Sequence, residues 1–181
     1  MKKLISLKLI TIFSAILFFT LSSTAFAKYY SYGYSLDVIG YIYQGTNAEY
    51  ISTQASQNWN NAAKTRIGYG PNSKNLIAHN EYPDSWLGLY RPSPYVSGNV
   101  TQFSISINKR TLADYQKREY PNSTYNTLAI NTATHELGHA LFLSDLADGS
   151  GDKSIMSYER DRTNSIPRKQ DVDEIKSMRG Y

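Results

Sequence analysis

Apolar and polar residues alternate along several short segments, and this alternation predicts β-strands. The clearest case is 100–108, where Phe103, Ile105 and Ile107 alternate with polar neighbours, as expected when one face of a strand meets the core. Aromatic and β-branched residues make residues 34–43 a second strand. Shorter strands are expected at 65–69, 74–82 and 85–91, because Gly and Pro residues mark turns between them.

Elsewhere the apolar residues recur at steps of three and four, which is typical of one face of a helix. This pattern predicts helices over 48–63 and from about Tyr125 to Phe142, and a last helix that follows Pro167. The order is then strand, helix, several strands, helix, loop and helix. We therefore expect an α/β fold with a mixed sheet backed by helices.

The first 27 residues have the three parts of a secretory signal peptide. Lysines precede an apolar run (9–21), and residues 25–27 (Ala-Phe-Ala) form a small-x-small cleavage site. The run is shorter than the ~20 apolar residues of a membrane-spanning helix. An uncleaved membrane anchor is the alternative. We expect cleavage after Ala27, a secreted protein with no membrane attachment, and one domain over 28–181, which is long enough to bury its own core.

Charge and cysteine content narrow the class of protein only slightly. The net charge is +4 (19 basic minus 15 acidic residues), and removing three signal-peptide lysines leaves +1. A nearly neutral chain lacks the excess of positive charge that is typical of nucleic-acid-binding proteins. The chain has no Cys, which favours a bacterial over an animal secretory setting. Its 16 Tyr residues suit strands and wet surfaces.

The segment His135-Glu136-Leu137-Gly138-His139 carries the strongest chemical pattern. Histidines four residues apart lie on one helix face and can share one metal ion. Catalytic zinc takes such ligands and keeps one position open for water. Glu136 lies about 100° round the helix, where its carboxylate can act as general base on that water. The pattern therefore predicts a zinc site with its own base.

The residues alone leave the third ligand open. His79 is the only other histidine, and a lone histidine is more often structural. Glu159 stands 20 residues after His139, a spacing similar to that of thermolysin-like peptidases, but its surroundings lack the apolar stripe of their second helix. Three aspartates complete the candidates: Asp145, Asp148 and Asp152.

Residues 135–145, followed by Ser154-Ile155-Met156-Ser157-Tyr158, resemble the metzincin metallopeptidases, most closely their small matrixin-like bacterial members. Their pattern is H-E-x-x-H-x-x-G-x-x-H followed by a methionine turn. The resemblance implies a zincin-like fold: a mixed twisted sheet with one antiparallel edge strand, a backing helix, an active-site helix and a C-terminal helix. It also implies that Met156 forms the floor below the metal and that Tyr158 contacts zinc or the reaction oxyanion.

By the same resemblance, Asp145 is the third ligand, as in the snapalysin group of small secreted proteases. Phe142 stands where the family has a glycine, which allows the chain to turn sharply out of the helix. Without a turn, Asp145 would lie ~15 Å along the helix axis from His135. We expect Leu143 or Ser144 to make that turn.

The resemblance further implies an extended peptide substrate that pairs with an edge strand. Residues 85–90 are the first candidate for this edge, and 74–82 are the second. We therefore expect a monomeric, secreted zinc endopeptidase with one catalytic Zn²⁺; a structural Ca²⁺ has no support in the sequence. One alternative is an extracellular binding module that kept the fold and lost activity. Another is a zinc hydrolase of non-peptide amides.

Overall fold

The computed structural model describes residues 29–94, 100–147 and 149–180, and the predicted signal peptide lies outside them. One five-stranded sheet has the order β2-β1-β3-β5-β4. Three neighbouring pairs are parallel, and β4 pairs with β5 antiparallel at one edge. The predicted α/β class with one antiparallel edge strand is therefore confirmed. The strands span Val38–Gly45 (β1), Arg66–Tyr69 (β2), Leu76–Asn80 (β3), Gly88–Ser93 (β4) and Gln102–Asn108 (β5).

This strand order decides between the two candidate edges. β3, from the segment 74–82, lies between β1 and β5 and has no free edge. β4, from the segment 85–91, has β5 on one side only. The second candidate was thus wrong, because a strand paired on both sides cannot accept a further chain.

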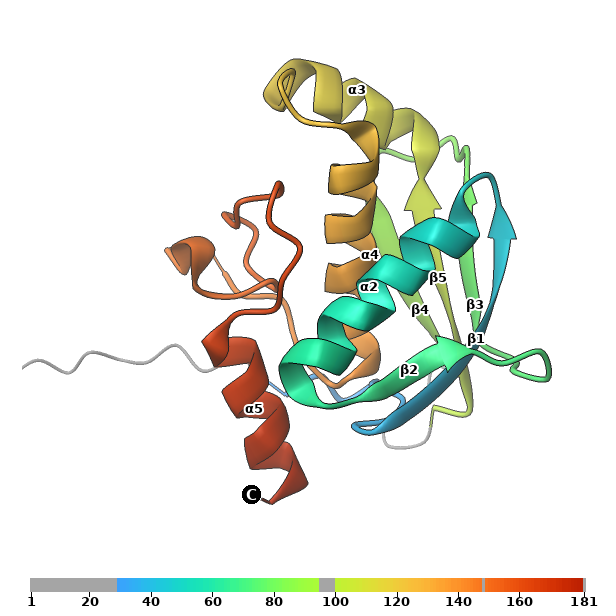
Figure 1. The fold of residues 1–181 in the computed structure, drawn as a ribbon, viewed down its shortest axis with the longest axis vertical. Helices are drawn as coiled ribbons and strands as arrows, with labels where there is room; N and C mark the ends of the chain where they lie inside the picture. The colour runs from blue at the N-terminus through green and yellow to red at the C-terminus, as the bar shows by residue number, and fades with distance from the viewer. Residues whose placement is uncertain (1–28, 95–99, 148, 181) are drawn as a thin grey trace, which may run out of the picture.

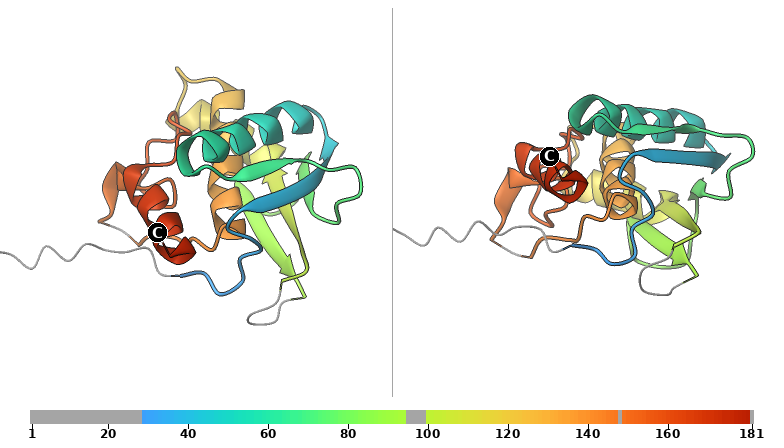
Figure 2. Two further views of the ribbon diagram at one scale, coloured as in Figure 1. Left: turned by 60° about the horizontal axis from the view of Figure 1, so that its bottom comes forward. Right: turned by 90° about the horizontal axis from the view of Figure 1, so that it is seen from below.

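Helices α2 and α4 lie on one face of the sheet and pack against each other (Figures 1 and 2). Trp59 of α2 is fully buried, and its indole N–H donates to the Thr134 carbonyl of α4 at 2.8 Å. Every residue of α4 from Asn131 to Ala140 is buried. The helices span Ala48–Ala63 (α2), Lys109–Glu119 (α3), Tyr125–Ala140 (α4) and Lys169–Arg179 (α5), with a short 3₁₀ turn at Gly151–Lys153.

One strand begins later than predicted, and one helix was not predicted. The predicted strand 34–43 joins the sheet only from Val38, because the backbone N–H groups of Tyr34 and Ser35 donate to the Ala140 carbonyl at the end of α4. The α3 helix was not predicted: Leu112 is its single buried residue, so it carries no apolar stripe.

Among the described residues, none of the helices is both long and apolar enough to cross a membrane.

Candidate metal centre

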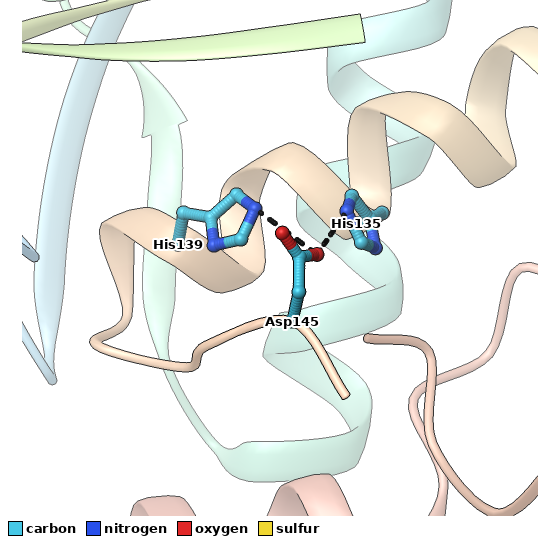
Figure 3. Close-up of side chains that lie close together, drawn as sticks. All are labelled: His135, His139 and Asp145. Atoms are coloured by element: carbon cyan, nitrogen blue, oxygen red, sulfur yellow. Dashed lines mark ion pairs between the residues drawn. The ribbon is translucent and has the colours of Figure 1, made fainter. Parts of the chain in front are cut away.

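Three side chains converge where α4 ends. His135 and His139 project from the same side of the helix, and Asp145 approaches from the loop that follows (Figure 3). Asp145 Oδ1 lies 3.1 Å from His135 Nε2 and 3.6 Å from His139 Nε2. Both histidines are nearly buried, whereas Asp145 is more accessible.

Backbone carbonyls fix the orientation of both imidazoles. His135 Nδ1 lies 3.0 Å from the Ile155 carbonyl oxygen, and His139 Nδ1 lies 2.9 Å from that of Leu143. A carbonyl only accepts hydrogen bonds, so each Nδ1 carries the proton and each Nε2 presents its lone pair. Metal-binding histidines are commonly oriented in this way.

The charge states make this donor set fit a cation. Burial lowers the pKa of His135 to about 3, and the positive charge of Arg160 adds to the effect, so the ring is neutral at pH 7. The pKa of the Asp145 carboxyl is lowered to about 2 although burial raises it, and the hydrogen bond that the Tyr158 hydroxyl donates is one cause, so this group is ionised at pH 7. Three acceptor atoms that face one another repel unless a cation lies between them.

The distances suit zinc in particular. Ligand atoms ~2.0–2.1 Å from a tetrahedral zinc ion lie ~3.3 Å from one another. The two contacts of Asp145 Oδ1, at 3.1 and 3.6 Å, lie close to that value. All three ligand atoms lie within 4.8 Å of one another. The geometry therefore accommodates His135, His139 and Asp145 around one ion.

The turn that brings Asp145 to the histidines is made by Phe142, which has φ +68°. The expectation that Leu143 or Ser144 makes the turn was wrong. The left-handed conformation occurs at position 142, where the metzincin pattern has glycine, and Leu143 N–H then donates to the Gly138 carbonyl at 3.0 Å. A non-glycine residue in this conformation costs roughly 1–2 kcal/mol, so neighbouring contacts must offset that cost.

The other candidate ligands have partners elsewhere. His79 is bonded through Nδ1 to the Thr46 carbonyl and through Nε2 to the Tyr125 hydroxyl at 2.5 Å. Glu159 accepts from the Gly151 backbone at 2.8 Å, and Asp152 pairs with Arg168 at 2.7 Å. Asp148 lies outside the described residues. Within the part of the chain that the structure describes, no second cluster of three such side chains forms.

Glu136 lies beside β4 and is 6% exposed. A Cβ atom on Gly88 would lie 2.6 Å from Glu136 Oε1, so only glycine allows this close approach. The Tyr90 backbone hydrogen-bonds the carboxylate, yet burial dominates and raises the pKa of Glu136 to about 7. A carboxyl group that titrates near neutrality is suited to accept and return a proton.

Met156 and Tyr158 lie in the segment between α4 and α5, where Met156 is buried and Tyr158 is exposed. Met156 is fully buried against α4, where a Cβ on Gly138 would lie 2.3 Å from its sulfur. Tyr158 is 56% exposed, and its hydroxyl donates to Asp145 Oδ2 at 2.9 Å. Tyr158 therefore contacts the carboxylate of the third candidate ligand.

Some residues that support the centre were not predicted from the sequence. The buried Asp171 of α5 accepts from the Ser154 hydroxyl and from the Ile155 backbone at 2.9 Å, and so fixes the loop that supplies the carbonyl partner of His135. The buried Arg160 donates to Asn131 of α4 at 2.9 Å. The sequence signal for this support was Asp171 in the first turn of the last helix. An acidic residue at that position is more often explained by its favourable interaction with the helix N-terminus.

Comparisons with known proteins give a likeness of fold. No protein-family model matches the chain, and no curated protein matches it in sequence. Among solved structures, the GM1-bound form of the ECX AB5 holotoxin contains a chain that is similar over 78% of this chain and 80% of its own, with 18% identity and a TM-score of 0.53. The hatching enzyme zinc-protease HCE-1 of Oryzias latipes matches over 89% and 97%, with 16% identity and a TM-score of 0.45. At these identities the first likeness concerns the fold alone, and the second is too weak to add support.

Proposed function

We propose that this protein is a secreted zinc-dependent endopeptidase. The observation that carries the proposal is the set of three facing acceptor atoms on His135, His139 and Asp145, with the Glu136 carboxyl on the same helix. A zinc ion held by these three residues would polarise a carbonyl group and make water acidic enough to ionise near pH 7.

Glu136 is the proton carrier in this proposal. Its carboxylate accepts a proton from the attacking water and passes that proton to the leaving amine. The raised pKa, about 7, makes both transfers accessible at neutral pH. Tyr158 is the second catalytic candidate: the residue is exposed beside Asp145, and its hydroxyl would leave Asp145 Oδ2 to donate to a developing oxyanion.

β4 is the proposed docking edge for an extended peptide. Asn108 N–H donates to the Leu87 carbonyl at 2.9 Å, and alternation along an antiparallel pair then directs the backbone nitrogens of Gly88, Tyr90 and Pro92 away from β5. The Tyr90 amide already bonds the Glu136 carboxylate, which leaves the Gly88 amide for a peptide. Pro92 has no N–H to donate, so peptide pairing is best at the start of the strand. Gly88 at that start lies close to Glu136, so a peptide paired there would lie beside the proposed base.

The test compares the protein that lacks residues 1–27 with its Glu136→Gln variant, which keeps the shape of the side chain. We expect about one zinc per chain in both by elemental analysis, and cleavage of casein only in the first. Zinc without hydrolysis of any peptide would favour a binding module that has lost activity. Hydrolysis of non-peptide amides alone would favour the other alternative, and a chain without zinc would refute the metal site.

Export of the full-length chain, followed by N-terminal sequencing, tests cleavage after Ala27.

A further inference from the structure

Phe142 is in a conformation that glycine normally provides, and contacts from the start of the described chain surround it. We propose that residues 29–35, here called the N-terminal strap, are a positioning element of the metal centre. In this proposal, Gly33 of the strap supplies the space that lets Phe142 adopt φ +68° and so directs Asp145 toward the histidines. Glycine is therefore required in the strap, at position 33, and not at the turn itself, at position 142. The inference rests on the proposed function, because it assumes that His135, His139 and Asp145 bind zinc.

The strap satisfies the carbonyl groups that α4 leaves free. The last carbonyls of a helix have no partner within it. Tyr34 N–H and Ser35 N–H donate to the Ala140 carbonyl at 2.8 and 3.1 Å, and Tyr30 N–H donates to the Phe142 carbonyl at 2.8 Å. These bonds anchor the backbone on both sides of the left-handed residue.

The Phe142 ring packs between strap residues. Its centroid lies 5.4 Å from that of Tyr29, and the two rings are nearly parallel, at 15°. On Gly33, a Cβ atom would lie 2.4 Å from Phe142 Cγ and 2.8 Å from Phe142 Cα. Gly33 itself does not have a left-handed backbone, so space and not conformation requires glycine here. These contacts partly bury the ring and so stabilise the strained turn.

The strap also contacts the second helix histidine. The ring centroid of Tyr30 lies 5.1 Å from that of His139. The Tyr90 hydroxyl donates to the Tyr32 carbonyl at 2.9 Å, and the Tyr90 ring is itself 6.0 Å from His139. One short segment thus supports both the turn that carries Asp145 and the imidazole that precedes the turn.

A double-mutant cycle tests the inference. Gly33→Ala should lower zinc affinity about 10–100-fold, the usual effect of removing support from a metal ligand. Phe142→Gly should keep zinc affinity within about threefold, since glycine makes the turn without strain. In the Phe142→Gly background, Gly33→Ala should cost at least about threefold less than alone, because the ring is gone; the contact with the Cα atom keeps the recovery partial. Gly68→Ala, whose added Cβ meets nothing within 4 Å, is the matched control.

A second readout works without metal. Hydrogen exchange of the Leu143 amide, which donates to Gly138, should be faster in Gly33→Ala than in the wild type and slower again in the double variant. Should Gly33→Ala fail to fold while the double variant folds, the clash is confirmed. Wild-type zinc affinity and exchange in Gly33→Ala, or a double variant no better than Gly33→Ala, would overturn the inference. If the wild type binds no zinc, the proposed function fails, and the exchange rates still decide whether the strap holds the turn.

Discussion

The two halves of the candidate metal centre are held in place by different means. The helix half consists of His135, Glu136 and His139, which share one rigid helix that is buried from Asn131 to its end. The loop half extends from Phe142 to Tyr158, and it depends on hydrogen bonds to distant parts of the chain, including Asp171. The helix fixes its side chains by local geometry, whereas the loop fixes Asp145 by tertiary contacts. Any loosening of the fold should therefore affect the loop half first.

Removal of a candidate ligand from each half gives the largest expected effect. His139→Ala should lower zinc affinity more than about 100-fold, since removing even an outer partner of a ligand costs about 10–100-fold. Asp145→Ala should also lower it strongly, but by less, because its side chain is the most accessible of the three. Competition with a chelating dye measures both. Asp152→Ala, which removes a pair with Arg168 and an acceptor of the Asp161 backbone N–H, is the control, and an effect equal to that of Asp145→Ala would exclude Asp145 as a ligand.

The contact between the halves can be disrupted at Gly138. In Gly138→Ala, the new methyl group would lie 2.3 Å from the Met156 sulfur and 3.2 Å from Trp59. We expect a loss of about 1–3 kcal/mol in the free energy of unfolding, typical of overpacking, despite the better helix propensity of Ala. Urea denaturation measures it, and Gly68→Ala should show no such loss. Equal stability of the two variants would mean that the Met156 side chain simply moves aside.

A milder change weakens the loop half alone. Asp171→Asn removes a carboxylate that accepts from Ser154, Ile155 and Arg168, so we expect a loss of about 1–3 kcal/mol in unfolding free energy. Because Ile155 also orients His135, zinc affinity should fall by up to about 10-fold. Asp173→Asn breaks only an exposed pair with Lys169 and should change stability by less than about 0.5 kcal/mol. Unaltered zinc affinity in Asp171→Asn would show that the loop does not need this anchor.

The smallest expected effect lies outside both halves. Burial lowers the pKa of His79 below its usual 6.5. Between that value and its folded pKa, the unfolded chain binds a proton that the folded chain does not, so stability falls as the pH falls below about 6.5. Denaturation of the metal-free protein across pH 5 to 7 should show this slope, and His79→Gln should reduce it. An unchanged slope would assign the effect to other groups, such as His135.

The same division explains what the sequence could predict. The bounds of α2 match the predicted 48–63, and the helix half of the centre follows from the four-residue spacing of its histidines. These features depend on local periodicity. The conformation of Phe142 depends on Gly33, and the orientation of His135 depends on the Ile155 carbonyl, so no local pattern could reveal either. The α3 helix was missed for a related reason, since a single buried Leu112 leaves no periodic signal.

Pro92 has a consequence for the behaviour of the protein in concentrated solution. An exposed edge strand is a template on which identical chains can pair and grow into aggregates. β4 has such an edge, but its proline lies at a position that faces away from β5, where it interrupts the row of donors. A second copy could therefore form only a short ladder on this edge. If the strand binds a peptide at its start as proposed, it would do so while it resists continuous pairing with a second copy of the chain.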